Sequence, residues 1–374
     1  MIYIDISAAV HSRAGLGRYS QHLATALLAQ QPEEYALFYN RGADGRFPLG
    51  LPDNIPQKSI SLGYKAWRMA ILMAQKNHLS FKRLVPEVTL FHSTEHLLFP
   101  LAKTPTVLTV HDLIYKLYPA YHKRLNLWYL NQAMPIFCER AKAIIAVSEA
   151  TKRDIVQNYA IDPQKIHVVY EAAADHFAPP EPGKIEKVRR EYELPRRFLI
   201  HLSTIEPRKN LDRLLDALLA VRQVFPDLHL VLVGSKGWLY DDFFARLASS
   251  GLENIVQPLG WVPDEDLPAV LAAADLAVQP SLYEGFGLPI LEHMASGQVV
   301  AASNAASHPE VGGEAAAYFD PTDVAEMAAV ILRLLKSKDE YRRRRELGLL
   351  QASKFSWQRA ANETRAVYDR LLAS

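Results

Sequence analysis

The sequence predicts an α/β protein built from two doubly wound parallel sheets, one in each half of the chain. Short apolar runs that suit strands alternate with amphipathic helical segments along nearly all of the 374 residues. The alternation breaks once, in residues 171–197, where prolines and a glycine surround a short charged helix. Runs such as 228–233 are apolar apart from His229, as parallel strands buried on both faces are. We therefore expect one domain over 1–175, a second over 176–354 and a terminal helical segment over 355–374.

The first half opens on the predicted strand 2–6 and a helix that follows Gly15 and Gly17. The Gly- and Pro-rich residues 41–60 are expected to form a loop, and Ser148 is expected to act as the N-cap of a helix. The other expected elements are strands at 35–39, 89–91, 106–110, 143–147 and 166–170 and helices at 64–84 and 125–140.

The second half repeats the pattern. We expect strands at 198–202, 228–233, 255–259, 275–279 and 299–302, and helices at 211–225, 241–249, 264–274, 288–296, 322–336, 338–350 and 357–372. Parallel sheets of this kind bind ligands outside the carboxyl ends of their strands. With two such domains, the expected site is the cleft between them.

Composition excludes several classes of protein. The net charge of +1 gives no reason to expect a nucleic-acid partner. The single cysteine, Cys138, excludes an internal disulfide framework and a Cys-rich metal site. The chain opens directly on a strand pattern without a basic leader segment, and no apolar run approaches the ~18 residues of a spanning helix. We expect a cytoplasmic protein.

The most informative stretch is 284–292, which joins a buried strand to a helix through Gly285 and Gly287. Glycine lets the backbone turn sharply and approach a ligand, and the first turn of the helix offers N–H groups to an anion. Glu284 and Glu292 bracket the loop. Because carboxylates repel phosphate, we expect both to face hydroxyl groups, so the loop predicts a sugar nucleotide as the ligand.

Two other segments are candidates for anion contacts. Arg208 and Lys209 precede a predicted helix, where cations oppose the helix dipole unless an anion is bound nearby. The segment Gly15-Leu-Gly-Arg18 opens the first long helix, so its N–H groups and Arg18 could hold a phosphate, although a plain helix start explains it equally well. It lacks the third glycine of a dinucleotide fingerprint.

Histidines also follow predicted strands. His111 and Asp112 stand at the edge where ligands bind, which predicts a proton acceptor or a contact with sugar hydroxyls. His92 and His96 would need a helix to ligate a metal together, and Pro100 with the surrounding loop character argues against one.

Trp261 and Val262 follow another predicted strand, where an aromatic side chain could hold a flat base. The Asp-x-Asp string 264–266 begins a predicted helix, where acidic residues favour capping, so we assign it no metal. The arginine run 342–345 is expected to be a solvated helix face. The helix 64–84 mixes basic and apolar residues, which suits either a packed surface helix or contact with an anionic membrane.

With these loops in place, the chain resembles the family 4 retaining glycosyltransferases of the GT-B fold over nearly its whole length. Residues 284–292 match the family's Glu-x7-Glu motif, 206–210 match its basic loop, and 15–18 match its N-terminal glycine loop. Residues 4–7 and 17–19 look most like bacterial mannosyltransferases of polysaccharide assembly. The resemblance implies two Rossmann-like domains facing a cleft, with the last helix crossing back onto an N-terminal acceptor-binding domain.

The resemblance also implies roles for single residues. It places Lys209 and Arg208 on the donor diphosphate, Glu284 on the transferred sugar and Glu292 on the ribose hydroxyls. It places His111 on the acceptor side near the reacting carbon. The remaining donor contacts that it implies are Gly15, Gly17, Arg18, Trp261, Val262, Gly285, Phe286, Gly287 and Leu288.

One position departs from the family pattern. Many members carry an arginine six residues before the basic-loop lysine, where this chain has Ser203, so Arg208 is expected to supply that charge. The family implies retention of anomeric configuration by front-face attack, with the leaving phosphate taking the proton and His111 positioning the reactants. No metal or other cofactor is expected, because fixed cations stabilise the leaving group, and domain closure would exclude water.

We therefore expect a hexosyltransferase that moves mannose from GDP-mannose to a glycan or a lipid-linked glycan, with peripheral contact at the inner face of the cell membrane. Two alternatives stay open: a UDP-sugar donor, and a non-catalytic nucleotide-sugar-binding protein. A Rossmann-type oxidoreductase is disfavoured by the missing third glycine. The sequence names neither the acceptor and linkage nor the oligomeric state.

Overall fold

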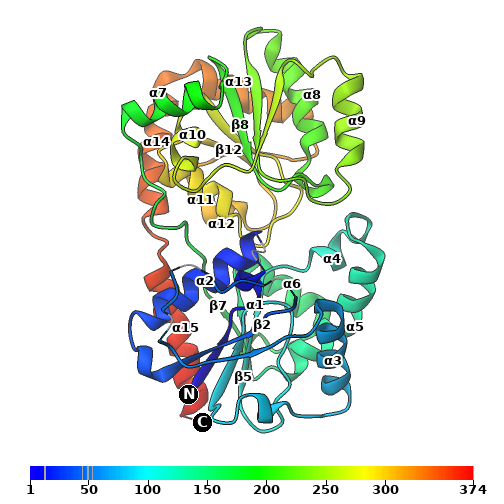
Figure 1. Cartoon of the computed structure of the whole chain (residues 1–374). Coiled ribbons are helices and arrows are strands. Elements are labelled where there is room, and N and C mark those ends of the chain that lie inside the picture. Colours follow the sequence, from blue (N-terminus) through cyan, green and yellow to red (C-terminus); the bar gives the residue numbers. More distant parts are fainter. Residues whose placement is uncertain (12–13, 44, 49, 53, 374) are drawn as a thin grey trace. The chain divides into compact units, whose positions relative to one another are not determined.

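Figure 1 shows the computed structural model, which describes residues 1–11, 14–43, 45–48, 50–52 and 54–373. The chain divides into two compact units. Unit 1 combines Met1–Glu171 with Ser356–Ser374, and unit 2 is Ala172–Phe355. The sequence-based boundaries were residues 175 and 354.

Unit 1 contains a seven-stranded parallel sheet in the order β3-β2-β1-β4-β5-β6-β7. Its strands are β1 Ile2–Asp5, β2 Tyr35–Asn40, β3 Gln57–Ile60, β4 Leu90–Ser93, β5 Thr106–Val110, β6 Ala143–Ala146 and β7 Ile166–Val168. Its α-helices are α1 Ser7–Val10, α2 Ala14–Leu28, α3 Tyr64–Lys76, α4 Ile114–Leu117, α5 Arg124–Arg140, α6 Glu149–Tyr159 and α15 Trp357–Leu372. Within this unit, α2 and α15 flank the sheet on one side, and α3 and α5 flank it on the other (Figure 1).

The core of unit 1 follows from its apolar strands. All five residues of β5 are buried, as expected for a strand covered on both faces. Beneath α3, the rings of Phe91 and Phe99 stack with centroids 4.2 Å apart, and Phe38 meets Phe99 edge to face. Such pairs stabilise the fold by about 0.5–1.5 kcal/mol each beyond the area that they bury. Trp67 of α3 packs against Phe38 and Phe99, each with ring centroids 6.2 Å apart, so this cluster holds α3 on the sheet.

The last helix, α15, packs on α2 and is therefore part of unit 1. Its Tyr368 hydroxyl lies 2.5 Å from His92 Nδ1 on β4, in a fully buried contact. Arg365 pairs with Glu34 (2.5 Å) and with Asp369 on its own helix (2.8 Å). A buried polar contact and a surface ion network thus hold this helix against the sheet.

Unit 2 contains a six-stranded parallel sheet in the order β10-β9-β8-β11-β12-β13. Its strands are β8 Phe198–Leu202, β9 His229–Val233, β10 Val256–Gly260, β11 Leu276–Gln279, β12 Val300–Ser303 and β13 Ala317–Phe319. Its α-helices are α7 Pro182–Glu191, α8 Leu211–Arg222, α9 Asp241–Ser249, α10 Leu267–Ala272, α11 Leu288–Ala295, α12 His308–Gly312, α13 Val324–Lys336 and α14 Lys338–Ala352. In Figure 1, α8 and α9 lie on one side of this sheet, and α7, α10 and α14 lie on the other.

Two expectations about single elements were wrong. The predicted loop 41–60, whose residues 44, 49 and 53 lie outside the described part, ends in the strand β3. Because β3 is a polar, mostly exposed edge strand, it carries no apolar pattern. The helix predicted over 64–84 stops at Lys76, before His78 with its left-handed φ of 54°. The short α12 and β13 were not predicted at all.

Both sheets have the same functional landmark, a topological switch point. The strand order reverses between β1 and β4 in unit 1, and between β8 and β11 in unit 2. Loops that leave the carboxyl ends of two such neighbouring strands run in opposite directions, which opens a crevice where ligands of doubly wound sheets bind. The loops after β8 and β11, and those after β1, β4 and β5, are therefore where functional side chains are expected.

Candidate functional site

Two loops of unit 2 meet at its switch point. Residues 203–210 follow β8, and residues 280–287 follow β11. The N–H of Leu282 donates to the carbonyl oxygen of Arg208 (2.9 Å), and Arg208 Nη1 donates to the carbonyl oxygen of Tyr283 (2.6 Å). The two loops thus form one unit in which the basic segment and the glycine segment are locked together.

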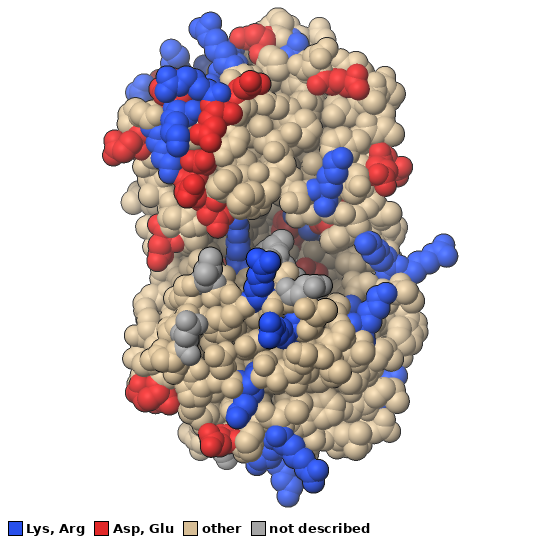
Figure 2. Space-filling model, in the orientation of Figure 1, with Lys and Arg blue, Asp and Glu red and all other residues tan. Residues whose placement is uncertain are grey.

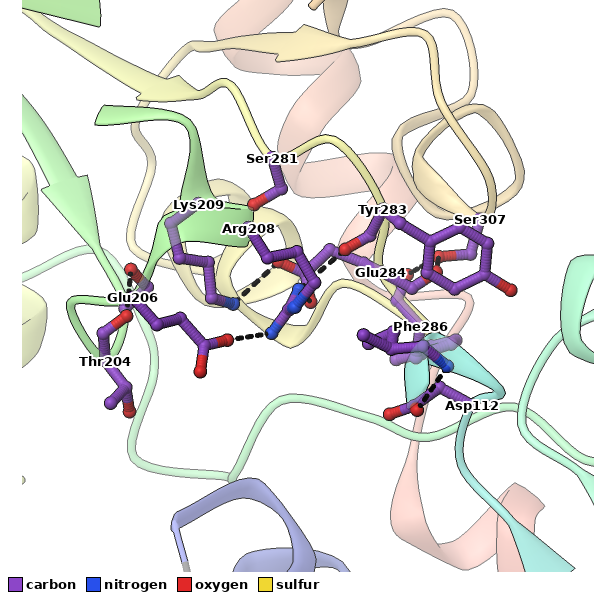
Figure 3. Close-up of polar contacts among 12 residues, drawn as sticks. Asp112, Thr204, Glu206, Arg208, Lys209, Ser281, Tyr283, Glu284, Phe286 and Ser307 are labelled. Atoms are coloured by element: carbon purple, nitrogen blue, oxygen red, sulfur yellow. Dashed lines mark hydrogen bonds and ion pairs between the residues drawn. The ribbon is translucent and has the colours of Figure 1, made fainter. Parts of the chain in front are cut away.

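A buried ion cluster lies where these loops join (Figure 3). Glu284 Oε1 lies 2.7 Å from Lys209 Nζ, and Glu284 Oε2 lies 2.7 Å from Arg208 Nη1. Arg208 Nη2 also pairs with Glu206 Oε1. Two carboxylates and two cations therefore compensate one another in a site where all four side chains are at least four-fifths buried.

The position of the two cations corrects the argument drawn from the helix dipole. Arg208 and Lys209 lie in a short 3-10 turn, Pro207–Lys209, and Asn210 with a left-handed φ of 60° separates that turn from α8. Their charges are compensated by Glu206 and Glu284, so the unfavourable dipole alone is no evidence for an anion. The remaining evidence for an anion site is that two buried cations lie at a switch point of the sheet.

Burial and charge set the ionisation states of this cluster. Burial by itself raises the pKa of Glu284, but the charges of Arg208 and Lys209 outweigh it and hold that pKa well below its usual range. Burial lowers the pKa of His201 and of His308 to about 4 each. At neutral pH the site thus holds an ionised carboxylate and two neutral imidazoles.

The glycine loop is shaped by close packing. Gly287 has φ 108°, and a Cβ there would lie 3.1 Å from the His308 ring, so both conformation and space require glycine. Ser307 Oγ lies within hydrogen-bond distance of the carbonyl oxygens of Glu284 (2.9 Å) and Phe286 (2.5 Å). The Phe286 ring is buried and meets Phe355 edge to face. Sequence reasoning missed Ser307 and His308, because they lie at the start of a short helix that was not predicted and belong to no recognised motif.

The helix α11 begins at Leu288, immediately after Gly287, as predicted. In its first turn Pro289 has no N–H and the Ile290 N–H donates to the carbonyl oxygen of Gly287 (2.9 Å), whereas the Leu288 N–H comes before the intrahelical hydrogen bonds begin. Glu292 lies one turn further along and is buried. Gly285 is buried beside Glu284. The glycine loop therefore brings together Glu284 and the start of α11 within unit 2.

The segment after β10 offers one exposed and one buried side chain. Trp261 is 69% exposed and Val262 is 3% exposed. The Asp-x-Asp string that follows leads into α10, with Asp266 at the N-cap position and its Oδ2 accepting from the Tyr192 hydroxyl (3.0 Å). The string precedes α10, as predicted, but the Asp266 side chain does not cap the helix, because it accepts from Tyr192 instead of from the first N–H groups.

In unit 1, His111 follows β5 and is buried. Its Nε2 lies 2.9 Å from the carbonyl oxygen of Thr94, and its Nδ1 lies 3.1 Å from Glu171 Oε1. Burial by itself lowers the pKa of His111, but the hydrogen bond and charge of Glu171 outweigh it and raise that pKa above its ordinary value. Both ring nitrogens are engaged within unit 1, so the predicted role of proton acceptor does not fit this arrangement.

The glycine segment of unit 1 also differs from the expectation. Gly15, Gly17 and Arg18 lie inside the first turns of α2 rather than in a loop ahead of it. A Cβ on Gly17 would approach the carbonyl oxygen of Ala8 to 3.0 Å, so this glycine allows α2 to pack closely on the short helix α1. The N–H group of Gly15 remains in the first turn, where helices leave donors without internal partners, whereas Gly17 lies at the fourth helical position.

His92 on β4 and His96 in the loop after it make hydrogen bonds within unit 1. His92 Nε2 lies 2.8 Å from Thr109 Oγ1, with Tyr368 on the other ring nitrogen. His96 Nε2 accepts from the backbone N–H of His111 (3.1 Å). Among the described residues, no three His, Cys, Asp or Glu side chains are grouped in a way that could hold a metal ion.

Two doubly wound parallel domains, each with polar loops at its switch point, define a two-domain α/β protein of the nucleotide-binding type. Sequence comparison then gives the family. A family model described as "Glycosyl transferases group 1" matches residues 184–348, and one described as "Glycosyltransferase Family 4" matches residues 13–173. The chain belongs to this family of glycosyltransferases.

Mannosyltransferases are among the proteins to which the chain is similar. O-antigen chain mannosyltransferase B of Escherichia coli is 32% identical over 376 residues, which cover 96% of either chain. MMP alpha-(1->4)-mannosyltransferase of Mycolicibacterium hassiacum is 37% identical over 234 residues, which cover 62% of this chain and 54% of the relative.

Solved structures confirm the GT-B fold. Sucrose-phosphate synthase from Thermosynechococcus elongatus superposes with a TM-score of 0.77 at 19% identity, over 100% of this chain and 99% of that one. HepE of Anabaena, solved with UDP-glucose, superposes with a TM-score of 0.76 at 20% identity, over 99% of either chain.

Proposed function

We propose that this protein is a retaining mannosyltransferase that moves mannose from GDP-mannose to a growing glycan or lipid-linked glycan. The observation that carries the proposal is the buried cluster of Arg208, Lys209 and Glu284 at the switch point of unit 2, beside the N-terminus of α11. Fixed cations and helix N–H groups stabilise a leaving diphosphate without reorganisation. The mannosyltransferase relatives support mannose as the transferred sugar.

The two cations are suited to different tasks. Among the described residues Lys209 Nζ makes one hydrogen bond, to Glu284 Oε1, although an ammonium group has three N–H donors. Arg208, by contrast, already contacts Tyr283, Glu206 and Glu284. We therefore assign the main diphosphate contact to Lys209, with Arg208 holding the glycine loop and adding charge.

The remaining assignments follow the family pattern. Glu284 would face hydroxyls of the transferred sugar and Glu292 those of the ribose, because carboxylates repel the diphosphate between them. Trp261 and Val262 would lie beside the base. Since cations of the chain supply the charge that the leaving group needs, transfer is proposed to proceed without a metal ion.

The donor can be tested by thermal shift with nucleoside diphosphates. GDP is expected to raise the Tm, because a ligand at about 100 times its Kd stabilises the folded state by about 2.7 kcal/mol. UDP at the same concentration is expected to leave the Tm unchanged, and EDTA is expected to alter neither result. The matching assay is mannose transfer from labelled GDP-mannose to a mannan oligosaccharide. A shift with UDP alone, together with transfer from a UDP-sugar only, would replace the donor assignment.

We further propose that unit 1 makes peripheral contact with an anionic membrane surface through its α3–α5 face. This face comprises the exposed residues Lys65, Met69, Met73, Lys76, Arg124, Leu125 and Trp128. The two helices are joined by hydrogen bonds from Arg68 to Asn126 (2.8 Å) and from Lys76 to Gln132 (3.3 Å).

Charge supports this proposal. Residues 64–86 and 113–138 contain no Asp or Glu at all, and the right-hand side of unit 1 in Figure 2 shows Lys and Arg without a visible acidic residue. Basic side chains near an anionic bilayer contribute about 1 kcal/mol each, and exposed apolar side chains add burial in the interface. No helix among the described residues is long and apolar enough to cross a membrane.

Membrane contact can be tested by co-sedimentation with vesicles. The protein is expected to sediment with phosphatidylcholine–phosphatidylglycerol vesicles and to stay in solution with phosphatidylcholine alone. Exchanging Leu125 and Trp128, which are 76% and 53% exposed, for serine is expected to lower the vesicle binding constant about 30-fold, since each apolar side chain contributes about 1 kcal/mol. The control is Leu350→Ser in α14, which removes an equally exposed leucine (63%) from unit 2. Equal losses in both variants would contradict the assignment.

A further inference from the structure

The carboxylate that contacts His111 is Glu171, a residue that belongs to no recognised sequence motif. Glu171 follows β7 and is 4% exposed, and its Oε1 lies 3.1 Å from His111 Nδ1. The other ring nitrogen, Nε2, lies 2.9 Å from the carbonyl oxygen of Thr94. The imidazole is thus clamped between a backbone oxygen from the loop after β4 and a carboxylate from the loop after β7.

The chemistry of these two partners fixes the protons of the ring. A carbonyl oxygen only accepts hydrogen bonds, so Nε2 must carry a hydrogen. An ionised carboxylate also only accepts, so Nδ1 carries a hydrogen as well when Glu171 is ionised. An imidazole with hydrogens on both nitrogens is an imidazolium. The ring therefore bears a positive charge and has no lone pair with which to take a proton from a substrate.

The other groups around the ring agree with a single charged imidazole. His96 accepts the backbone N–H of His111 at its Nε2, so that ring has a lone pair there and is neutral. Burial lowers the pKa of His96 to about 4 and that of His92 to about 3. Asp112 is a second acidic group that favours the charged ring. The ring of Tyr19 stands perpendicular to that of His111, with centroids 4.6 Å apart.

We propose that Glu171 is a positioning residue of this transferase: its carboxylate keeps His111 as an imidazolium, so that His111 acts in transfer as a fixed positive charge and not as a base. The part of the inference that concerns transfer rests on the proposed function, whereas the protonation of the ring does not. The leaving phosphate then remains the group that takes the proton of the acceptor hydroxyl, and the charged ring stabilises negative charge that develops at the reacting centre.

The test uses Glu171→Gln, which keeps the shape and an accepting oxygen but removes the charge. Ring nitrogen NMR of the whole protein, with the His111 signal assigned by its loss in His111→Gln, is expected to show a doubly protonated ring at pH 7 in the native protein. In Glu171→Gln the same ring is expected to titrate below 6.5. The alkaline limb of the pH profile of kcat/KM is expected to move down with it, by about tenfold in rate at high pH for each unit of pKa lost.

Two further variants sharpen the result. Glu171→Asp retains the carboxylate and is expected to return the limb toward its native position, and Glu33→Gln, which removes an exposed acid of unit 1, is expected to change nothing. A neutral His111 at pH 7 in the native protein overturns the proposal, whether or not Glu171→Gln folds. A ring titration that moves while the kinetic limb stays in place overturns the role in transfer. Absence of any transfer by the native protein would count against the proposed function, and the ring titration still decides the assignment of Glu171.

Discussion

Replacing Lys209 with methionine is expected to lower kcat/KM for transfer by about 10²–10³-fold, because removal of one fixed donor to developing charge has an effect of that size. Lys209 is the cation of the cluster with N–H donors to spare, since its ammonium group contacts only Glu284 Oε1 among the described residues. Methionine retains much of the length and volume of the side chain. The loss should appear in kcat as well as in KM, because the charge of the leaving diphosphate grows in the transition state.

A matched control separates charge at the site from charge in general. Lys187 in α7 is 65% exposed and pairs with Glu191 four residues along the helix. Such surface pairs contribute about 0.3–0.5 kcal/mol, so Lys187→Met should leave both transfer and stability near native values. Near-native kcat/KM in Lys209→Met would remove this lysine from the machinery of transfer and shift the diphosphate contact to Arg208.

Much of the fold was predictable because parallel sheets leave a strong signal. Buried strands such as β5 and β8 are mostly apolar and are buried along their whole length, and α9 begins and ends where its periodicity predicted. Elements without such a signal were missed. The edge strand β3 is polar because one side has no neighbour, and β13 spans only three residues. Short or polar strands such as these have no apolar pattern of their own, because pairing with neighbouring strands is what forms them.

The candidate site was predictable in part for a similar reason. The role of Gly287 as a turn residue could be predicted from sequence, because a glycine between a strand and a helix indicates a sharp turn. The structure has positive φ and close packing at this position. The pairing of Glu284 with Lys209 could not, because the two residues are brought together by the order of β8 and β11 in the sheet. Glu171 likewise reaches His111 only through the adjacency of strands. Motifs identify side chains within one loop, whereas topology decides which loops meet.

Glu284→Ala is expected to lower the free energy of unfolding by about 3–5 kcal/mol, in addition to abolishing transfer. Breaking a buried ion pair by removing one partner costs this much because the other charge stays buried without compensation. Here two cations, Arg208 and Lys209, would be left side by side with Glu206 as their only remaining carboxylate in the cluster. Urea unfolding followed by circular dichroism measures the loss.

A double-mutant cycle distinguishes this mechanism from simple loss of packing. If the cost comes from uncompensated charge, adding Lys209→Met to Glu284→Ala should recover about 1–3 kcal/mol relative to the sum of the single changes. Additive losses would instead point to packing. The pH dependence has a definite sign. Because the pKa of Glu284 is held below its ordinary value of 4.5, its stabilising contribution is complete above that pH and is lost progressively as the pH falls from 4.5 to the lowered folded-state pKa. The difference in stability between the native protein and Glu284→Ala should therefore be constant around neutral pH and shrink as the pH falls below 4.5.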